Sequence, residues 1–300
     1  MKKKLLISFS GGRTSAFMTK WLLDNKQDEY EMKVVFANTG KEREETLEFI
    51  RDCDKHFGFN TVWIETVMQE YGVGASFKIV NFETASRKGE PFRDVIKKHG
   101  IPNMASKHCT REMKSTPIKA YIRSTGWKPK EYETAIGFRI DKPKRFNTPK
   151  KKKSAIKKKH IYPLVYWLPM KKQEIHDWWK KQEFDLKLKD HEGNCDLCWK
   201  KTENKLIAII GVCPSRADWW KQMENEFENF TPDSKKHNKK IKPPHRFFIG
   251  NVSISELEDK AKKFFEQAKD ETAIEIHEQA LVNNYNPKQI RLCNESCEPF

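Results

Sequence analysis

A turn rich in glycine and hydroxyl side chains follows the first apolar run of the chain. Residues 10–15 read Ser-Gly-Gly-Arg-Thr-Ser and stand between an apolar strand pattern and a helical pattern. Glycine lets a backbone approach a ligand closely, and the first N–H groups of a helix have no partner inside that helix. The arrangement therefore predicts an anion-binding site. The residues expected to contribute are Ser8, Ser10, Gly11, Gly12, Arg13, Thr14 and Ser15.

A second group of reactive side chains involves the cysteines. Cys195 and Cys198 are separated by two residues, a spacing that lets two thiolates reach one metal ion or cluster. Two completions of such a site stay open. Either Cys109 joins the pair, or Cys293 and Cys297 close a four-thiolate site for zinc or a 4Fe–4S cluster. Seven cysteines in a chain too long to need disulfide staples indicate a reducing compartment.

The elements that must position these groups alternate in type over the first half of the chain. Strands are expected at residues 5–9, 34–37, 61–64 and 133–137, and helices at 16–24 and about 42–56. Cys53 falls on the apolar stripe of the second helix and is expected in the core. Such alternation predicts an α/β fold, with a mainly parallel sheet covered on both faces.

Helical patterns dominate the remainder of the chain, at residues 171–184, around 206–210 and at 256–269. We therefore expect an α/β domain at residues 1–165. A helical C-terminal region that carries the cysteine site is expected at 166–300.

The chain is strongly basic, with a net charge of +16 over 300 residues and a pI near 9.4. Two segments without any acid, residues 142–159 and 235–246, concentrate lysine and arginine and are expected to be exposed loops. They are either a solvated surface or a footprint for the phosphates of DNA or RNA. No apolar run approaches the roughly 18 residues of a membrane span, so we expect a cytoplasmic protein with no membrane partner.

Residues 10–15 resemble the PP-loop of the N-type ATP pyrophosphatases, a superfamily that includes the phosphoadenylyl-sulfate (PAPS) reductases and nucleic-acid thiolation enzymes. Further segments resemble PAPS-reductase-like proteins in the same order along the chain. They are Cys109-Thr110-Arg111-Glu112-Met113-Lys114, Gly137-Phe138-Arg139-Ile140-Asp141 with Arg145, Tyr162-Pro163-Leu164, and Gly193-Asn194-Cys195 with Cys198, Lys200 and Lys201. The nearest likeness is to an uncharacterised phage and prophage branch. It implies an adenine nucleotide α-hydrolase fold, which is a Rossmann-like, doubly wound sheet.

The resemblance also implies roles for residues. The PP-loop would hold the phosphates or sulfate of ATP or PAPS, with Mg²⁺ as a companion ion. The end of the second strand would meet the adenosine through Phe36, Asn38, Thr39 and Gly40. Four basic residues, Arg111, Lys114, Arg139 and Arg145, would neutralise phosphate or sulfate. Cys109, Arg139 and Asp141 are the expected catalytic residues.

Two positions depart from the patterns of the resembling proteins. Thiolation-type pyrophosphatases usually carry Lys and Asp where this chain has Arg13 and Thr14, so Asp141 is the expected substitute for a carboxylate that assists Mg²⁺. PAPS reductases carry a nucleophilic cysteine within Glu-Cys-Gly-x-His on the C-terminal tail. Here the tail around Cys297 lacks that glycine and histidine.

Three functions follow as hypotheses. The first is adenylyl-dependent sulfur chemistry, with thiolation of a nucleic acid as the version that the charge favours and a sulfur-donor protein as partner. The second is a PAPS or APS reductase that releases sulfite and takes electrons from a donor protein. The third is a non-catalytic phage factor that binds a nucleotide or a nucleic acid.

Overall fold

The computed structural model describes residues 1–70, 72–104, 106–189, 191–236 and 242–267. These residues form two compact units. Unit 1 comprises Met1–Arg87 and Thr110–Leu188, and unit 2 comprises Lys88–Cys109 and the described residues from Lys189 onward. Residues 166–188, which the sequence analysis assigned to the C-terminal region, belong to unit 1 because their apolar side chains enter its core.

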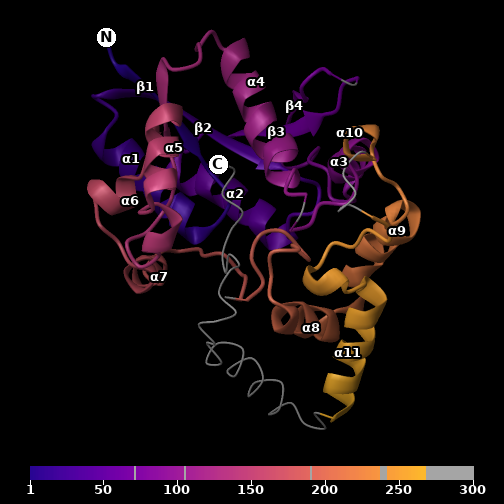
Figure 1. The fold of residues 1–300 in the computed structure, drawn as a ribbon. Coiled ribbons are helices and arrows are strands. Elements are labelled where there is room, and N and C mark those ends of the chain that lie inside the picture. The colour runs from indigo at the N-terminus through magenta and orange to yellow at the C-terminus, as the bar shows by residue number, and fades with distance from the viewer. Residues whose placement is uncertain (71, 105, 190, 237–241, 268–300) are drawn as a thin grey trace. The chain divides into compact units, whose positions relative to one another are not determined.

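A six-stranded sheet runs through unit 1 (Figure 1). In spatial order the strands are β4 (Ser76–Val80), β3 (Val62–Val67), β2 (Tyr30–Asn38), β1 (Lys3–Ser8), β5 (Tyr132–Ala135) and β6 (His160–Ile161). All neighbours are parallel except β3 and β4. The expected mainly parallel α/β sheet is therefore confirmed. The chain leaves β1 toward β2 and returns to its other side at β5, so the switch point of the topology lies between β1 and β5.

Both faces of this sheet are covered, as a buried parallel sheet requires. Leu5 and Ile7 of β1 belong to one core cluster with α1 (Arg13–Asn25), α2 (Glu44–Phe57) and α7 (Lys172–Trp179). Leu6, which points to the opposite face, packs with α4 (Thr116–Ser124). Cys53 is fully buried, as expected, and that burial raises the pKa of its thiol above the ordinary value.

The sequence analysis expected residues 142–159 to be a loop, and that expectation is wrong for most of the segment. Residues Pro149–Lys158 form helix α5, preceded by a short helical turn at Pro143–Arg145. A proline in the first turn and a run of lysine suit a helix, because lysine is a good helix former and proline needs no N–H donor there. The lysines nevertheless remain exposed, so the segment is a basic helix surface.

Three further elements complete unit 1. The antiparallel strand β4 and the short helix α6 (Pro163–Tyr166) were not expected from the sequence. A π-helical turn, η1 (Arg111–Ser115), leads directly into α4.

Unit 2 is helical in its described residues. It contains α3 (Glu90–His99), α8 (Glu203–Val212), α9 (Asp218–Phe227), α10 (Asp233–Lys236) and α11 (Ile254–Gln267). Buried Trp220 and Phe247 pack with their rings 4.9 Å apart, and the carboxylate of Glu224 accepts hydrogen bonds from the backbone N–H groups of Phe247 and Ile254. None of the described helices combines the length and apolar character needed to cross a bilayer.

Candidate nucleotide site and cysteine segment

The glycine turn leads from the carboxyl end of β1 into α1. Gly11 has a φ of +77°, and a Cβ atom there would lie 2.6 Å from the Cγ2 atom of Thr46 in α2. Only glycine therefore fits this position. Gly12 is the N-cap of α1 and has no side chain to cap the first N–H groups of the helix. The Ser10 and Ser15 hydroxyl oxygens lie 2.9 Å apart, and Ser15 donates to the Gly12 carbonyl at 3.0 Å.

The end of β5 packs against this turn, as the switch point of the sheet requires. A Cβ atom at Gly137 would lie 3.3 Å from the Cα atom of Ser15. Two residues later, the Nη1 of Arg139 donates to the Thr14 hydroxyl at 2.9 Å. The same guanidinium donates to both carboxylate oxygens of Asp141, at 2.9 and 3.2 Å. The structure thus brings together two segments that the sequence analysis selected separately.

The electrostatics of this contact follow from burial. Arg139 is only 6 % exposed. Partial burial raises the pKa of the Asp141 carboxyl. The hydrogen bonds and the charge of Arg139 lower that pKa by more than burial raises it, so the net pKa lies below the ordinary value. Asp141 is therefore ionised at neutral pH and holds the guanidinium of Arg139 against the turn.

Arg13 is placed differently from the expectation that it would add charge toward an anion. Its guanidinium forms a fork with Asp185, with an Nε–Oδ1 distance of 2.6 Å and an Nη2–Oδ2 distance of 3.0 Å, and it also donates to the carbonyl of Leu186. The Nε1 of Trp179 donates to the Arg13 carbonyl at 3.0 Å. These contacts tie the start of α1 to the segment after α7.

The carboxyl end of β2 carries a second polar cluster. The Oδ1 of Asn38 accepts the Gly40 N–H at 3.1 Å and shapes the turn at Gly40, whose φ is +77°. Glu42 has a fully buried side chain, whose Oε1 accepts from the Thr39 hydroxyl at 3.1 Å and from the Lys114 ammonium at 3.3 Å. Lys114, expected at a ligand phosphate, is thus an ion partner of a buried acid that the sequence analysis did not select.

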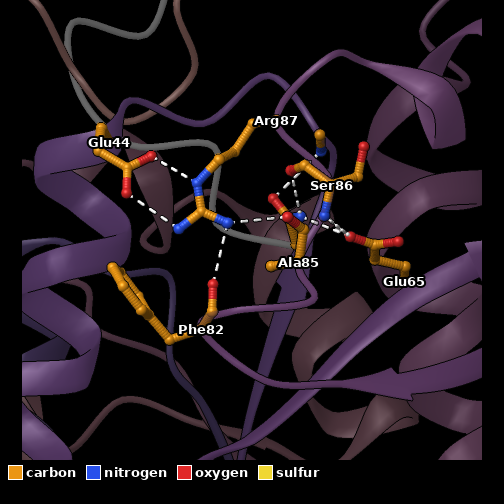
Figure 2. Close-up of polar contacts among 8 residues, drawn as sticks. Glu44, Glu65, Phe82, Ala85, Ser86 and Arg87 are labelled. Atoms are coloured by element: carbon orange, nitrogen blue, oxygen red, sulfur yellow. Dashed lines mark hydrogen bonds and ion pairs between the residues drawn. The ribbon is translucent and has the colours of Figure 1, made fainter.

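Residues 82–87 form a clasp, whose contacts with Glu44 and Glu65 are drawn in Figure 2. The clasp reaches the polar cluster through the Ser86 carbonyl, which accepts from the Nδ2 of Asn38 at 2.8 Å. The Oε1 of buried Glu65 in β3 accepts from the Nδ2 of Asn38 at 2.7 Å and from the Ser86 N–H at 2.5 Å. Arg87 forms a fork with Glu44 at 2.7 and 2.9 Å and donates to the carbonyls of Phe82 and Ala85. The side chain of Asn38 is therefore fixed before any ligand binds.

Four of the selected residues lie in other surroundings. The ring of Phe36 is buried in the core, 5.1 Å from the ring of Trp63. The side chain of Arg111 is 67 % exposed and pairs with its neighbour Glu112. Arg145 stacks over the ring of Phe138 at 4.4 Å. The hydroxyl of Ser8 is buried at the end of β1 without a hydrogen-bond partner among the described residues.

The cysteine segment lies in unit 2, and so does Cys109, the last residue before the chain passes into unit 1. Cys109 is buried, and the Nε1 of Trp199 donates to its sulfur at 3.4 Å. Cys195 and Cys198 are partly exposed. The Lys201 ammonium donates to the Cys195 and Asp196 carbonyls at 2.5 and 2.7 Å and so fixes the backbone of the pair. The hydrogen bond from Trp199 therefore connects Cys109 to the segment that carries Cys195 and Cys198.

The metal site remains a prediction. Within the part of the chain that the structure describes, no three side chains of His, Cys, Asp or Glu converge as metal ligands. Cys293 and Cys297, the second completion of the site, lie outside the described residues.

The basic helix α5 adds a charged surface to unit 1. Its lysines are exposed, and even its apolar Ile156 is 80 % exposed. Burial lowers the pKa of Lys119, and the nearby positive charges of Lys158 and Arg123 lower it further. Like charges therefore crowd where α4 and α5 approach, which makes the surface attractive to a polyanion.

Comparisons with known proteins agree with this geometry. The phosphoadenosine phosphosulfate reductase domain matches residues 4–187. The chain is 29% identical over 300 residues to the uncharacterised nin region protein ORF290 of Escherichia phage lambda, covering 98% of this chain and 94% of that protein. It is 28% identical over 187 residues to an uncharacterised protein of Methanocaldococcus jannaschii, covering 59% of this chain but 31% of that protein. No solved structure matches the chain significantly.

Proposed function

The chain belongs to the phosphoadenosine phosphosulfate reductase domain family, and from that premise we propose that it binds ATP or PAPS at the glycine turn and performs adenylyl-dependent sulfur chemistry. The observation that carries the proposal is the contact of Arg139 with both Thr14 and Asp141. It sets a buried cation beside uncapped N–H groups at the switch point of a parallel sheet, where nucleotides bind in such folds.

Each group of the site has a stated task in this proposal. The first N–H groups of α1 and the hydroxyls of Ser10 and Ser15 donate to phosphate or sulfate oxygens. Arg139 neutralises the charge that develops on them, and Asp141 keeps its guanidinium in place. The fixed turn at Asn38–Gly40 faces the adenosine. Because Glu42 already pairs with Lys114, that lysine balances the buried acid instead of the ligand.

The favoured reaction is sulfur insertion into a nucleic acid. A carbonyl oxygen of the acceptor base attacks the α-phosphorus of ATP, and pyrophosphate leaves. The terminal sulfur of a persulfide on a donor protein then attacks the activated carbon, and AMP leaves with the oxygen. A second thiol of the donor protein attacks the donor sulfur of the resulting C–S–S linkage, which breaks the S–S bond, releases the thiolated base and leaves a disulfide on the donor. The exposed lysines of α5, which lies in the same unit as the glycine turn, support a nucleic acid as the acceptor.

Cys109 bears on the alternative reductase reaction. In that reaction a thiolate attacks the sulfonyl sulfur of PAPS and adenosine 3′,5′-bisphosphate leaves. A thiol of an electron-donor protein then attacks the sulfur of the S-sulfonated cysteine, so that sulfite leaves and a disulfide forms. Cys109 is 7 % exposed and lies against Trp199. A nucleophile has to be reached by its substrate, so we favour the first reaction.

The test measures ligand binding and products on the full chain. We expect ATP or PAPS to bind, and Arg139→Lys to weaken that binding by about tenfold to a hundredfold, because lysine cannot form the fork. The matched control Arg51→Lys, on the exposed face of α2, should bind like the parent chain. Pyrophosphate release on adding nucleic acid and a sulfur donor supports the proposal. Sulfite release from PAPS would replace it with the reductase, and equal binding by Arg139→Lys would contradict the assigned site.

A further inference from the structure

A basic cavity of about 170 Å³ lies wholly within unit 2. It is formed by residues that follow α3, residues around α10, and the turn that precedes α11. The lining residues are His99, Gly100, Ile101, Asn103, Ser106, Phe230, Pro232, Lys235, Lys242, Pro244, His245 and Asn251. No acidic residue is among them, whereas two lysines and two histidines are.

The charge of the lining is held in place by hydrogen bonds. The Lys235 ammonium lies 2.5 Å from the His99 carbonyl and 2.5 Å from the Ser106 hydroxyl, which anchors it at the wall. His245 is held by the Thr231 hydroxyl at 2.7 Å from its Nε2. Burial lowers the pKa of His245, and the charge of Lys235 lowers it further, as expected in a positive field.

Two acids of the neighbouring chain segments are paired with other cations. Glu228 forms an ion pair with Arg246, and Asp233 pairs with Lys236 at 2.5 Å. The wall itself is closely packed, because Gly100 has a φ of +76° and a Cβ atom there would lie 3.2 Å from the Cδ atom of Pro232. One wall of the cavity is therefore formed where Gly100 packs against the ring of Pro232.

The size and the charge of the cavity together indicate the class of ligand. Its volume of about 170 Å³ corresponds to roughly five or six waters, which is enough for a tetrahedral oxyanion. Lysine ammonium groups bind such anions as point charges. We propose that this cavity binds a phosphate or sulfate group. The group comes either from a free anion or from a nucleic-acid backbone, and the site is independent of the glycine turn in unit 1.

The experiment must separate this site from the glycine turn. The full chain carrying Gly12→Asp serves as the background, because the backbone of Gly12 is extended and an aspartate there repels anions from α1. Binding of inorganic phosphate to this variant is measured by calorimetry. We expect a remaining site, and the added Lys235→Met and Lys242→Met substitutions should weaken it by about tenfold or more.

A matched control and a second readout protect against loss of folding. Lys263→Met removes the same charge from an exposed position on α11 and should leave phosphate binding unchanged. Phosphate should also protect Lys242, but not Lys263, from acetylation in the Gly12→Asp chain, as read by mass spectrometry. No phosphate binding in this chain, or equal binding after loss of both lysines, would overturn the proposal.

Competition experiments on the same Gly12→Asp chain identify the source of the anion. A single-stranded oligonucleotide that displaces phosphate, and whose binding falls with Lys235→Met and Lys242→Met, identifies a backbone phosphate as the ligand. An oligonucleotide that leaves phosphate bound identifies the free anion. Because neither readout involves nucleotide turnover, failure here leaves the proposed function of unit 1 intact.

Discussion

The glycine turn of unit 1 and the cysteine segment of unit 2 are held in different ways. The turn is fixed by three contacts within unit 1, since α2 restricts Gly11, Gly137 after β5 lies against Ser15, and Arg139 bonds to Thr14. The cysteine segment lies in a loop, where Lys201 fixes two carbonyls and one N–H reaches Cys109. The strand-end motif is thus fixed by contacts from several parts of unit 1, whereas the described contacts of the cysteine segment come from its own loop and from Cys109.

The largest expected effect comes from breaking the turn. Gly11→Ala should destabilise the chain by about 3 kcal/mol and abolish nucleotide binding, because the new Cβ atom combines positive φ with overlap on Thr46. Gly126→Ala is the matched control, since its φ is also positive but nothing lies within 4 Å of the added atom. It should cost only about 1 kcal/mol. Urea unfolding of both variants measures the difference, and equal costs would show that Thr46 is not the cause.

Substitution of Arg13 tests whether this residue stabilises the fold or binds the nucleotide. Arg13→Met should lower stability by about 1–2 kcal/mol, because it removes the fork to Asp185 and leaves the Leu186 carbonyl without this donor. Nucleotide affinity should change by less than about threefold, unlike the loss expected for Arg139→Lys. A large loss of affinity at unchanged stability would place Arg13 at the ligand instead.

The response of stability to pH tests the fork between Asp141 and Arg139 beside the glycine turn. The pKa of Asp141 is lowered in the folded chain, so its fork to Arg139 stabilises the chain fully above the unfolded pKa of about 4. That contribution, about 1 kcal/mol after allowance for exposure, is lost as pH falls through the lower folded pKa. Acid unfolding curves of the parent chain and Asp141→Asn should therefore converge only below about pH 4. Convergence near neutral pH would show that the fork is not formed.

The smallest effect concerns the cysteines and is kinetic. Cys195 and Cys198 are partly exposed, whereas Cys109 is buried. Iodoacetamide labelling followed by mass spectrometry should therefore modify the pair about tenfold faster than Cys109. Buried Cys53 serves as the slow reference. Labelling of Cys109 at the rate of the pair would restore the reductase hypothesis, because its thiol would then be open to a substrate.

Much of the glycine-turn site could be predicted from local sequence, and the reason is geometric. In a parallel sheet the carboxyl ends of all strands share one edge, so the turn after β1 and the Gly137–Asp141 segment after β5 had to approach each other. What failed depends on partners distant in sequence. Nothing near Arg13 indicates Asp185, and nothing near Lys114 indicates Glu42.

The helical state of residues 149–158 was missed for a different reason. A run of lysine without apolar periodicity is typical of a solvated loop, but lysine propensity and Pro149 are sufficient for a short helix whose Ala155 is buried.

The clasp at residues 82–87 has a mechanical consequence. Arg87 is the last residue of unit 1 before the chain enters unit 2, and its guanidinium is bound at once to Glu44 and to two carbonyls of its own segment. The Arg87 side chain therefore fastens the point where the chain leaves unit 1 to the first turn of α2. This point lies one residue after Ser86, whose N–H donates to Glu65.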